Sequence, residues 1–258
     1  MKVAIQVQAD DRFHNINFFQ AHEGFKKLGY EVERFEWYSP EQTFYTPSKD
    51  TVVVGGIPVI DWVYKQLGVS NPDLGDYPKK LSKYLNRYYD KTTIGYIRKT
   101  IQFESENNII NQYFIKPLAK NRKKFTGHVV SRFVDLIRTS GLPDDEVVWT
   151  SSVINLLSEY RVFVHNKQIV GMKHYKGDYL LFPNANVIRD MVNMYTDCPV
   201  AYALDIGLQH VNDFSDLRTV LVEVNDANAL GCYGLDPITY AKMIADRWNE
   251  VMSNGNQS

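Results

Sequence analysis

The stretch from Leu221 to Gly234, LVEVNDANALGCYG, contains an apolar run interrupted by a carboxylate and, two positions later, by an amide. Side chains alternate across a β-strand, so the valines of this strand are expected to share one face in a core. Glu223 and Asn225 then share the opposite face. A strand with the composition of a core strand therefore presents two oxygen-bearing side chains side by side.

The preceding predicted strand, PVAYALDIGLQ at 199–209, has the same property. Its carboxylate, Asp205, shares a face with two alanines, which leave room around it. If the two strands pair, Asp205, Glu223 and Asn225 converge on one patch. Mg²⁺ takes one or two protein carboxylates and completes its shell with phosphate oxygens and water. The alternative is that both carboxylates are exposed charges on a solvated sheet face.

Cations precede this oxygen cluster in the chain. Lys116 interrupts the apolar segment YFIKPL, and its alternative role is that of a lysine at the end of a strand. A basic loop follows, with Lys120, Arg122, Lys123 and Lys124 before Thr126 and Gly127. Such a loop can close over phosphates with backbone donors and a lysine. It is not a Walker motif, because the spacing differs and no GK[ST] occurs.

A predicted hairpin at 159–178 supplies two more cations. With a three-residue turn at 166–168, Arg161 lies directly opposite Lys173. Like charges opposite each other destabilise a sheet, unless an anion lies between them. The alternative is a pair of solvated cations. Taken together, the cations and the oxygen cluster predict a site for a polyphosphate with its metal, as phosphoryl transfer requires.

The remaining pattern predicts a mixed α/β chain. Strands at 2–8, 30–37 and 50–56 alternate with helices at 17–29 and 59–68, which is typical of a small α/β unit with a parallel sheet. A turn-rich linker is expected at 69–78. The later elements are helices at 79–90, 128–141, 184–196 and 236–252 and strands at 112–118, 145–153 and 218–226, besides the hairpin and the strand already described.

Composition excludes several classes of protein. The chain has 258 residues, 44% of them hydrophobic, and a net charge of −1, so no basic field for nucleic acid is present. No stretch approaches the ~20 apolar residues of a membrane span. Acidic residues occur too close to the start of the chain for a signal peptide. Two distant cysteines fit neither a disulfide framework nor a thiolate metal site. We therefore expect a cytoplasmic protein.

The order of these residues resembles the ATP-grasp superfamily over about residues 90–250. The segments SEYRVFV and VEVNDANALGCYG are similar to those of a divergent bacterial and phage subclade. The resemblance implies an α/β and α+β fold, in which a preATP-grasp-like unit (1–90) precedes an ATP-grasp domain with antiparallel sheets (91–252). Within that domain, a nucleotide-binding lobe is expected at about 110–155 and a catalytic lobe at about 156–252, before a polar tail at 253–258.

The resemblance also implies roles for single residues. Lys116 would contact the nucleotide phosphates, and Lys124, Thr126 and Gly127 would belong to a loop that covers them. Adenine is expected near Trp149, Ser151 and Val153. Arg161 and Lys173 are expected to contact phosphate or acyl phosphate, and Asp205, Glu223 and Asn225 to bind Mg²⁺. Where many members have an arginine two residues before the first metal carboxylate, this chain has Ala203, so Arg161 or Arg189 is expected to replace it.

The function implied is that of an ATP-dependent carboxylate–amine ligase that uses ATP and Mg²⁺ and forms an amide or peptide bond through an acyl phosphate. Its substrates would be small-molecule, peptide or protein carboxylates and amines, and homodimers are common among such proteins. The alternatives are a nucleotide-binding module without ligase activity and a kinase-like relative. Gly55 and Gly56 are either an anion-binding turn, for instance for the carboxylate substrate, or a tight turn into a helix.

Overall fold

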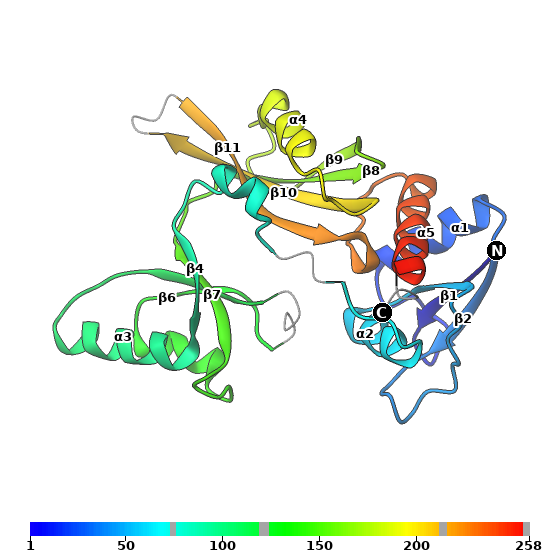
Figure 1. Cartoon of the computed structure of the whole chain (residues 1–258), viewed down its shortest axis with the longest axis horizontal. Coiled ribbons are helices and arrows are strands. Elements are labelled where there is room, and N and C mark those ends of the chain that lie inside the picture. Colours follow the sequence, from blue (N-terminus) through cyan, green and yellow to red (C-terminus); the bar gives the residue numbers. More distant parts are fainter. Residues whose placement is uncertain (73–75, 119–123, 212–215, 255–258) are drawn as a thin grey trace.

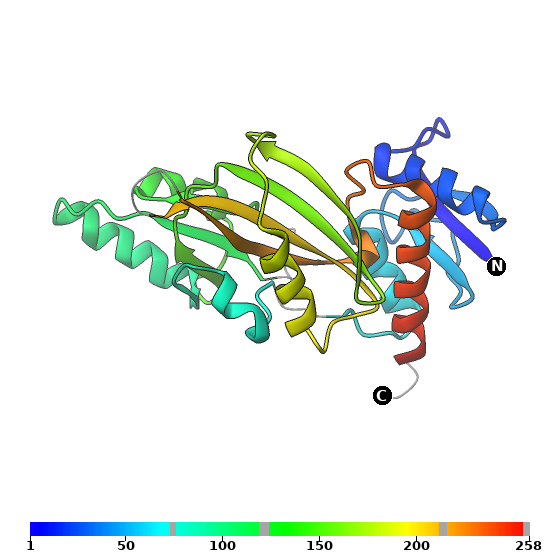
Figure 2. The ribbon, with the colours of Figure 1, turned by 90° about the horizontal axis from the view of Figure 1, so that it is seen from above.

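A computed structural model describes residues 1–72, 76–118, 124–211 and 216–254. Three sheets with their helices follow one another along the molecule (Figure 1). The N-terminal unit lies at one end, the sheet β8–β11 in the middle and the sheet β4–β7 at the other end. Figure 2 shows the same order from above. The architecture is the expected mixture of a parallel α/β unit and antiparallel sheets.

The N-terminal unit has a parallel sheet of order β2-β1-β3, as predicted. It consists of β1 (Lys2–Val7), β2 (Glu31–Glu36) and β3 (Thr51–Val54), with the helices α1 (Ile16–Lys27) and α2 (Ile57–Gln66). Asn15 caps α1, because its side chain accepts from the backbone of Asn17 and Phe18. The cap on α2 is Gly56, which has no side chain to accept such bonds.

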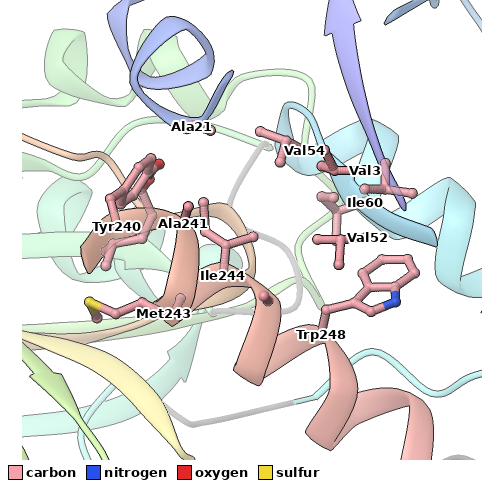
Figure 3. Close-up of a cluster of buried hydrophobic side chains, with 14 of the residues drawn as sticks. Val3, Ala21, Val52, Val54, Ile60, Tyr240, Ala241, Met243, Ile244 and Trp248 are labelled. Carbon is pink, nitrogen blue, oxygen red and sulfur yellow. Dashed lines mark hydrogen bonds between the residues drawn. The ribbon is translucent and has the colours of Figure 1, made fainter. Parts of the chain in front are cut away.

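The C-terminal helix α5 (Pro237–Asn254) packs against this first unit and also against the sheet that precedes it in sequence, through Phe163, Ala201 and Ala203. Its residues Ile244 and Trp248 belong to the same buried cluster as Val52 and Ile60 (Figure 3). A Cβ on Gly24 of α1 would lie 1.9 Å from a backbone oxygen of α5, so only glycine permits this helix contact. The predicted helix is confirmed, and it extends two residues into the segment expected to be a tail.

A second part, the β4–β7 lobe, has an antiparallel sheet of order β4-β7-β5-β6. Its strands are β4 (Tyr89–Thr93), β5 (Tyr113–Pro117), β6 (His128–Val130) and β7 (Val147–Ser152). The helix α3 (Ile94–Glu106) and the 3-10 helix η3 (Phe133–Thr139) cover one face. Ile97, Ile115 and Val148 are buried there. The opposite face, with Lys116 and Trp149, is directed away from this core.

Two of the helices predicted in this region are wrong, and a third helix was missed. The helix expected at 79–90 is a short 3-10 helix, η1 (Lys79–Tyr84), because Asn86 takes a left-handed conformation with φ of 47° and the chain enters β4. The helix expected at 128–141 is β6 followed by η3. The Asp135 carboxylate accepts from the backbone of Ser131 and Arg132, which turns the chain between them. Helix α3 was not predicted.

The third part, the β8–β11 lobe, has a four-stranded antiparallel sheet of order β11-β10-β8-β9. Its strands are β8 (Ser158–His165), β9 (Gln168–Gly177), β10 (Ala201–Val211) and β11 (Asp216–Asp226). Helix α4 (Ala185–Met194) and η1 cover one face, where Met191, Leu204 and Leu221 are buried. The alternate residues of these strands form the opposite face.

The β8–β9 hairpin has a two-residue turn at Asn166 and Lys167, both with positive φ, and not the expected three-residue turn. An irregularity between Phe163 and Val164 adds one residue to β9 and restores the register. Arg161 therefore lies opposite Lys173, as predicted.

The segment expected to be a linker at 69–78 does more than connect two parts. Its residues 73–75 lie outside the described residues, but the backbone N–H of Val224 donates to the Asp76 carbonyl at 3.1 Å. Arg87 donates to the carbonyls of Leu221 and Val222. Since β11 is an edge strand, these bonds satisfy backbone groups that would otherwise face solvent. They also fix Asp76 beside the uncovered face of the sheet.

Candidate active site

A row of charged side chains crosses the face of the β8–β11 lobe that lies opposite α4 and η1. The strand register places Asp205 opposite Arg161 on one side and opposite Glu223 on the other, and Lys173 follows Arg161. The row therefore runs from two cations to two carboxylates. Asp205 is only 4% exposed, which excludes the alternative of a solvated surface charge.

Arg161 and Asp205 form a buried bidentate pair. Arg161 donates from Nε and Nη2 to the two carboxylate oxygens of Asp205, each at 2.7 Å. Burial raises the pKa of Asp205, and the bonds from Arg161 oppose this rise. The ring of Tyr233 lies 4.6 Å from the guanidinium carbon and covers it. The pair explains how the sheet tolerates Arg161 opposite Lys173 without a bound anion.

Asn225 joins the two carboxylates. Its Nδ2 donates to Asp205 at 3.1 Å and to Glu223 at 3.3 Å, as expected from its place on the same face. Asn225 is therefore within hydrogen-bond distance of both predicted metal-binding carboxylates. This is the convergence expected from the strand pattern.

Lys116 connects the two lobes. Its Nζ lies 2.6 Å from Glu223 Oε2, on the far sheet, and 2.8 Å from Asp76 Oδ1. The residue is 9% exposed, so it is not a solvated lysine at a strand end. Asp76 also accepts a 2.8 Å bond from Trp149 Nε1. One carboxylate of the supposed linker thus orients two residues of the β4–β7 lobe.

The pKa values reflect this mutual neutralisation. Burial by itself would lower the pKa of Lys116, but the carboxylates of Glu223 and Asp76 outweigh it, and the pKa lies above its usual value. Burial would likewise raise the pKa of Glu223, but Lys116 outweighs it, and the pKa lies below its usual value. Both groups are therefore charged at neutral pH.

Aromatic rings surround Lys116 on the side of the β4–β7 lobe. Tyr77 lies 5.0 Å from Trp149 and 5.4 Å from Tyr89 between ring centroids, and Lys116 Nζ lies 5.0 Å from the Tyr77 ring. Lys91 lies over the Trp149 ring at 4.8 Å. Sequence reasoning missed Asp76, Tyr77 and Lys91. The first two stand in a turn-rich segment without periodicity, and Lys91 follows the helix expected at 79–90, in a strand, β4, that was not predicted.

The predicted phosphate-covering loop is described only in part. Lys120, Arg122 and Lys123 lie outside the described residues. Lys124 pairs with Glu146 at 2.5 Å and not with the central cluster, and Thr126 is exposed. Gly127 lies directly against the strand of Lys116, since a Cβ on it would be 3.1 Å from Lys116 Cβ and 2.8 Å from Phe114.

The predicted adenine contacts fall on and after β7. This strand is central in its sheet, so Trp149 and Ser151 use their backbone groups in pairing with β4 and β5. The ring of Trp149 packs against Tyr77, whereas Ser151 is buried. Val153 is the first residue after the strand. A base that pairs with backbone therefore has to do so beyond Ser152.

Arg189 does not join the cluster, which corrects the prediction. It lies on α4 and is exposed, and it donates to Asn186 on the same helix. Helix α4 packs on the covered face through Ile188 and Met191. The sheet therefore separates Arg189 from Asp205. Of the two arginines expected to compensate for Ala203, only Arg161 lies beside Asp205.

The donor set fits Mg²⁺ in its chemistry. Two carboxylates and one amide oxygen are hard ligands of the kind that this ion prefers. Among the described residues, no group of three or more His, Cys, Asp or Glu side chains is placed to hold a metal. Any divalent ion at this site would thus use Asn225 and the oxygens of a bound phosphate besides the carboxylates.

Several known proteins share the fold of this chain. The chain shares its fold with D-alanine–D-alanine ligase from Bacillus anthracis (TM-score 0.58, 12% identity, 100% of this chain and 99% of that chain). The chain also shares its fold with a RimK domain protein ATP-grasp from Sphaerobacter thermophilus DSM 20745 (TM-score 0.55, 13% identity, 98% of each chain). A third structure with this fold is D-cycloserine synthetase DcsG (TM-score 0.58, 11% identity, 96% of this chain and 100% of that chain).

No curated protein matches the chain. No helix of the described residues is long and apolar enough to cross a membrane. The profile of the ATP-grasp domain, R2K clade family 2, matches residues 84–243, which is more than half of the chain and includes the whole row of charges. This match shows the family: the chain belongs to the ATP-grasp domain, R2K clade family 2.

Proposed function

We propose that this protein is an ATP-dependent carboxylate–amine ligase that acts through an acyl phosphate. The observation that carries the proposal is the contact of Lys116, from one lobe, with Glu223, from the other. A phosphate chain with its metal replaces this contact on both sides, since the phosphate is a partner for the lysine and the metal for the carboxylate. Family membership and the fold support the same reading.

Lys116 and Arg161 would bind and neutralise the transferring phosphoryl group, with Lys173 next in the row. Arg161 is held rigidly by Asp205, so its charge needs little reorganisation during the reaction. Asp205, Glu223 and Asn225 would hold Mg²⁺, which supplies neutralisation of phosphate charge when bound. The aromatic rings around Tyr77 and the backbone beyond Ser152 would contact the base.

In the first step, a substrate carboxylate oxygen attacks the γ-phosphorus of ATP, and the bond to the β-phosphate oxygen breaks to release ADP. In the second step, an amine attacks the acyl carbon, phosphate leaves with the electron pair of the carbon–oxygen bond, and the amine proton passes to solvent. Neither step needs a nucleophilic side chain. The contribution of the protein is positioning and charge neutralisation.

Hydroxylamine separates this proposal from its alternatives. With ATP, Mg²⁺ and a panel of carboxylic acids, an acyl phosphate yields a hydroxamate, whereas a phosphorylated alcohol does not. We expect a hydroxamate from wild type and from Glu33→Gln, an exposed glutamate of β2, and none from Glu223→Gln. ADP release without a hydroxamate indicates a kinase-like enzyme, and binding without turnover indicates a nucleotide-binding module.

The acid and the amine would be small molecules, peptides or protein termini, with no role for nucleic acid. The reaction would take place in the cytoplasm, where ATP is supplied. The unpaired thiols of Cys198 and Cys232 agree with a reducing compartment. A homodimer is compatible with the proposal, and sedimentation of the purified protein tests it.

A further inference from the structure

A tight turn in the loop after β11 holds a tyrosine in an unusual backbone conformation. The backbone N–H of Leu235 donates to the carbonyl of Cys232 at 2.8 Å, which closes the turn. Its two central residues, Tyr233 and Gly234, have φ of 43° and 77°. Positive φ at both central positions is the mark of a type I′ turn, in which glycine, asparagine and aspartate predominate. Tyr233 is therefore strained, because a residue with a bulky side chain rarely adopts this conformation.

The surrounding structure holds the turn from both sides. Cys232 is fully buried, and its backbone N–H donates to Asn17 Oδ1 at 2.8 Å, at the start of α1. Leu235 is also buried, in the same cluster as the residues of α5. Strained residues persist only where their surroundings fix them, and they concentrate at functional sites. The conformation of Tyr233 is thus a reason to ask what its side chain does.

The ring of Tyr233 contacts the arginine of the candidate active site. Its centroid lies 4.6 Å from the guanidinium carbon of Arg161 and 5.2 Å from the ring centroid of Tyr175 on β9. A Cβ on Gly231 would lie 3.3 Å from Tyr233 Cε2 and 3.4 Å from Arg161 Nη1, so glycine at this position leaves room for both groups. The turn therefore brings an aromatic face onto a buried cation.

Hydrophobic burial does not explain this placement. Tyr233 is 46% exposed, so its ring contributes little to a core. Arg161, in contrast, is 8% exposed, and a cation–π contact is stronger when the cation is removed from water. What the strained turn provides is the contact with the guanidinium.

This contact completes the orientation of Arg161. Nε and Nη2 donate to the carboxylate of Asp205, which fixes the guanidinium within its own plane, and the ring of Tyr233 fixes the tilt of that plane. Nη1 forms no hydrogen bond with the described residues, and it is not one of their buried unpaired atoms, so solvent reaches it. Nη1 is therefore the nitrogen that an oriented guanidinium leaves for a ligand.

From these observations we propose that Tyr233 is a positioning residue for phosphoryl transfer. Its ring holds the guanidinium of Arg161 in the plane in which Nη1 donates to the transferring phosphoryl group. This deepens the proposed ligase function, on which it rests, by adding a residue that acts through Arg161. Donors that are oriented in advance need little reorganisation as charge develops, which is the benefit that the strain in the turn brings.

The test compares two ligands of the full-length protein by calorimetric titration, Mg-ADP and the Mg²⁺ complex of a non-hydrolysable ATP analogue. Both contain the base, the ribose and two phosphates, but only the analogue carries a group in the place of the γ-phosphoryl group. We expect wild type to prefer the analogue. In Tyr233→Gly this preference should be about fivefold smaller, with the affinity for Mg-ADP unchanged. An equal preference in both proteins overturns the proposal.

Glycine is the informative substitution because it adopts the left-handed conformation without strain, so the turn should persist. We expect a melting temperature close to that of wild type. A lower melting temperature, with equal loss of affinity for both ligands, would show that the ring is structural and would overturn the proposal. Tyr233→Phe keeps the aromatic face and should bind both ligands as wild type does. Loss of the preference in Tyr233→Phe contradicts a role of that face.

Asn108→Gly is the matched control. It relieves another left-handed residue, with φ of 55°, just after α3 in the β4–β7 lobe, and should leave the preference unchanged. A smaller preference in this variant would assign the effect to backbone relief and overturn the proposal.

The same titrations separate this proposal from the ligase function. Wild type that binds neither ligand refutes the ligase function itself. Wild type that binds both ligands equally removes the phosphoryl role of Arg161, and the positioning role falls with it. If wild type prefers the analogue and Tyr233→Gly does so equally, only the positioning role is refuted.

Discussion

Asp205 and Glu223 lie opposite each other on neighbouring strands, and the structure holds them differently. Asp205 is paired with Arg161 from the next strand of the same sheet, and both side chains are buried. The Glu223 side chain is 31% exposed, and its partner Lys116 comes from the other lobe. The first pair is therefore part of one folded sheet, whereas the second joins two lobes. This difference separates a carboxylate whose partner is fixed within the sheet from one that, in the proposed function, exchanges its partner for a ligand.

The largest expected effect breaks the first pair. Asp205→Asn removes the charge partner of a buried guanidinium, and the loss of one member of a buried pair costs about 3–5 kcal/mol of unfolding free energy. Urea denaturation measures it. The double variant Arg161→Met/Asp205→Leu should recover most of this loss, since it leaves no unpaired charge. A cost below about 1 kcal/mol for Asp205→Asn would show that the pair is not structural.

Asp76→Asn tests the carboxylate that sequence reasoning missed. Asparagine still accepts from Trp149 but no longer neutralises Lys116, so we expect a loss of about 1–3 kcal/mol in stability. Binding of an ATP analogue should tighten several-fold, because one of two carboxylates that compete with phosphate for Lys116 is gone. Calorimetry measures this. Tenfold weaker binding would indicate that Asp76 positions Lys116 for phosphate instead.

Glu223→Gln is the matched change at the exchangeable pair. Lys116 keeps Asp76 and the glutamine oxygen remains an acceptor, so the cost in stability should be about 1 kcal/mol. Urea denaturation beside Asp205→Asn makes the comparison direct. Equal costs for the two variants would remove the distinction between the pairs.

The smallest effect concerns Asp236, an exposed carboxylate outside both pairs. The backbone N–H of Thr239 donates to it at the start of α5 and holds its pKa below the usual value. Because the folded-state pKa is lower than the unfolded one, the stabilising contribution is complete above pH ~4 and is lost as the pH falls below that value. Asp236→Asn keeps the cap, so its stability should depend less on pH in this range. Melting curves of both proteins between pH 2 and pH 7 check this, and an unchanged dependence contradicts the assignment.

The sequence predicted the parts of the site that depend on strand alternation. Asp205, Glu223 and Asn225 share a face because period two fixes it, and Arg161 meets Lys173 although the turn is one residue shorter than expected. Lys116 was found because it interrupts an apolar strand. In each case a local pattern determines the direction of a side chain.

The parts that failed depend on contacts between distant segments. Asp76 and Tyr77 lie beside Lys116 and Trp149 because their segment runs along the edge of β11, which no local pattern reveals. Arg189 was expected near Asp205 because its helix precedes that strand in the chain, but the sheet lies between the two residues. Helix α5 packs on the N-terminal unit because Gly24 admits it, and spacing within either helix does not show this.

The central claim is that Glu223 exchanges Lys116 for a metal-bound nucleotide. Calorimetric titration with a non-hydrolysable ATP analogue, with and without Mg²⁺, tests it most directly on wild type, Glu223→Gln and the control Glu33→Gln. The account predicts Mg²⁺-dependent binding by wild type and control, with the Mg²⁺ dependence lost in Glu223→Gln. Equal binding by all three proteins, or none by wild type, would contradict it.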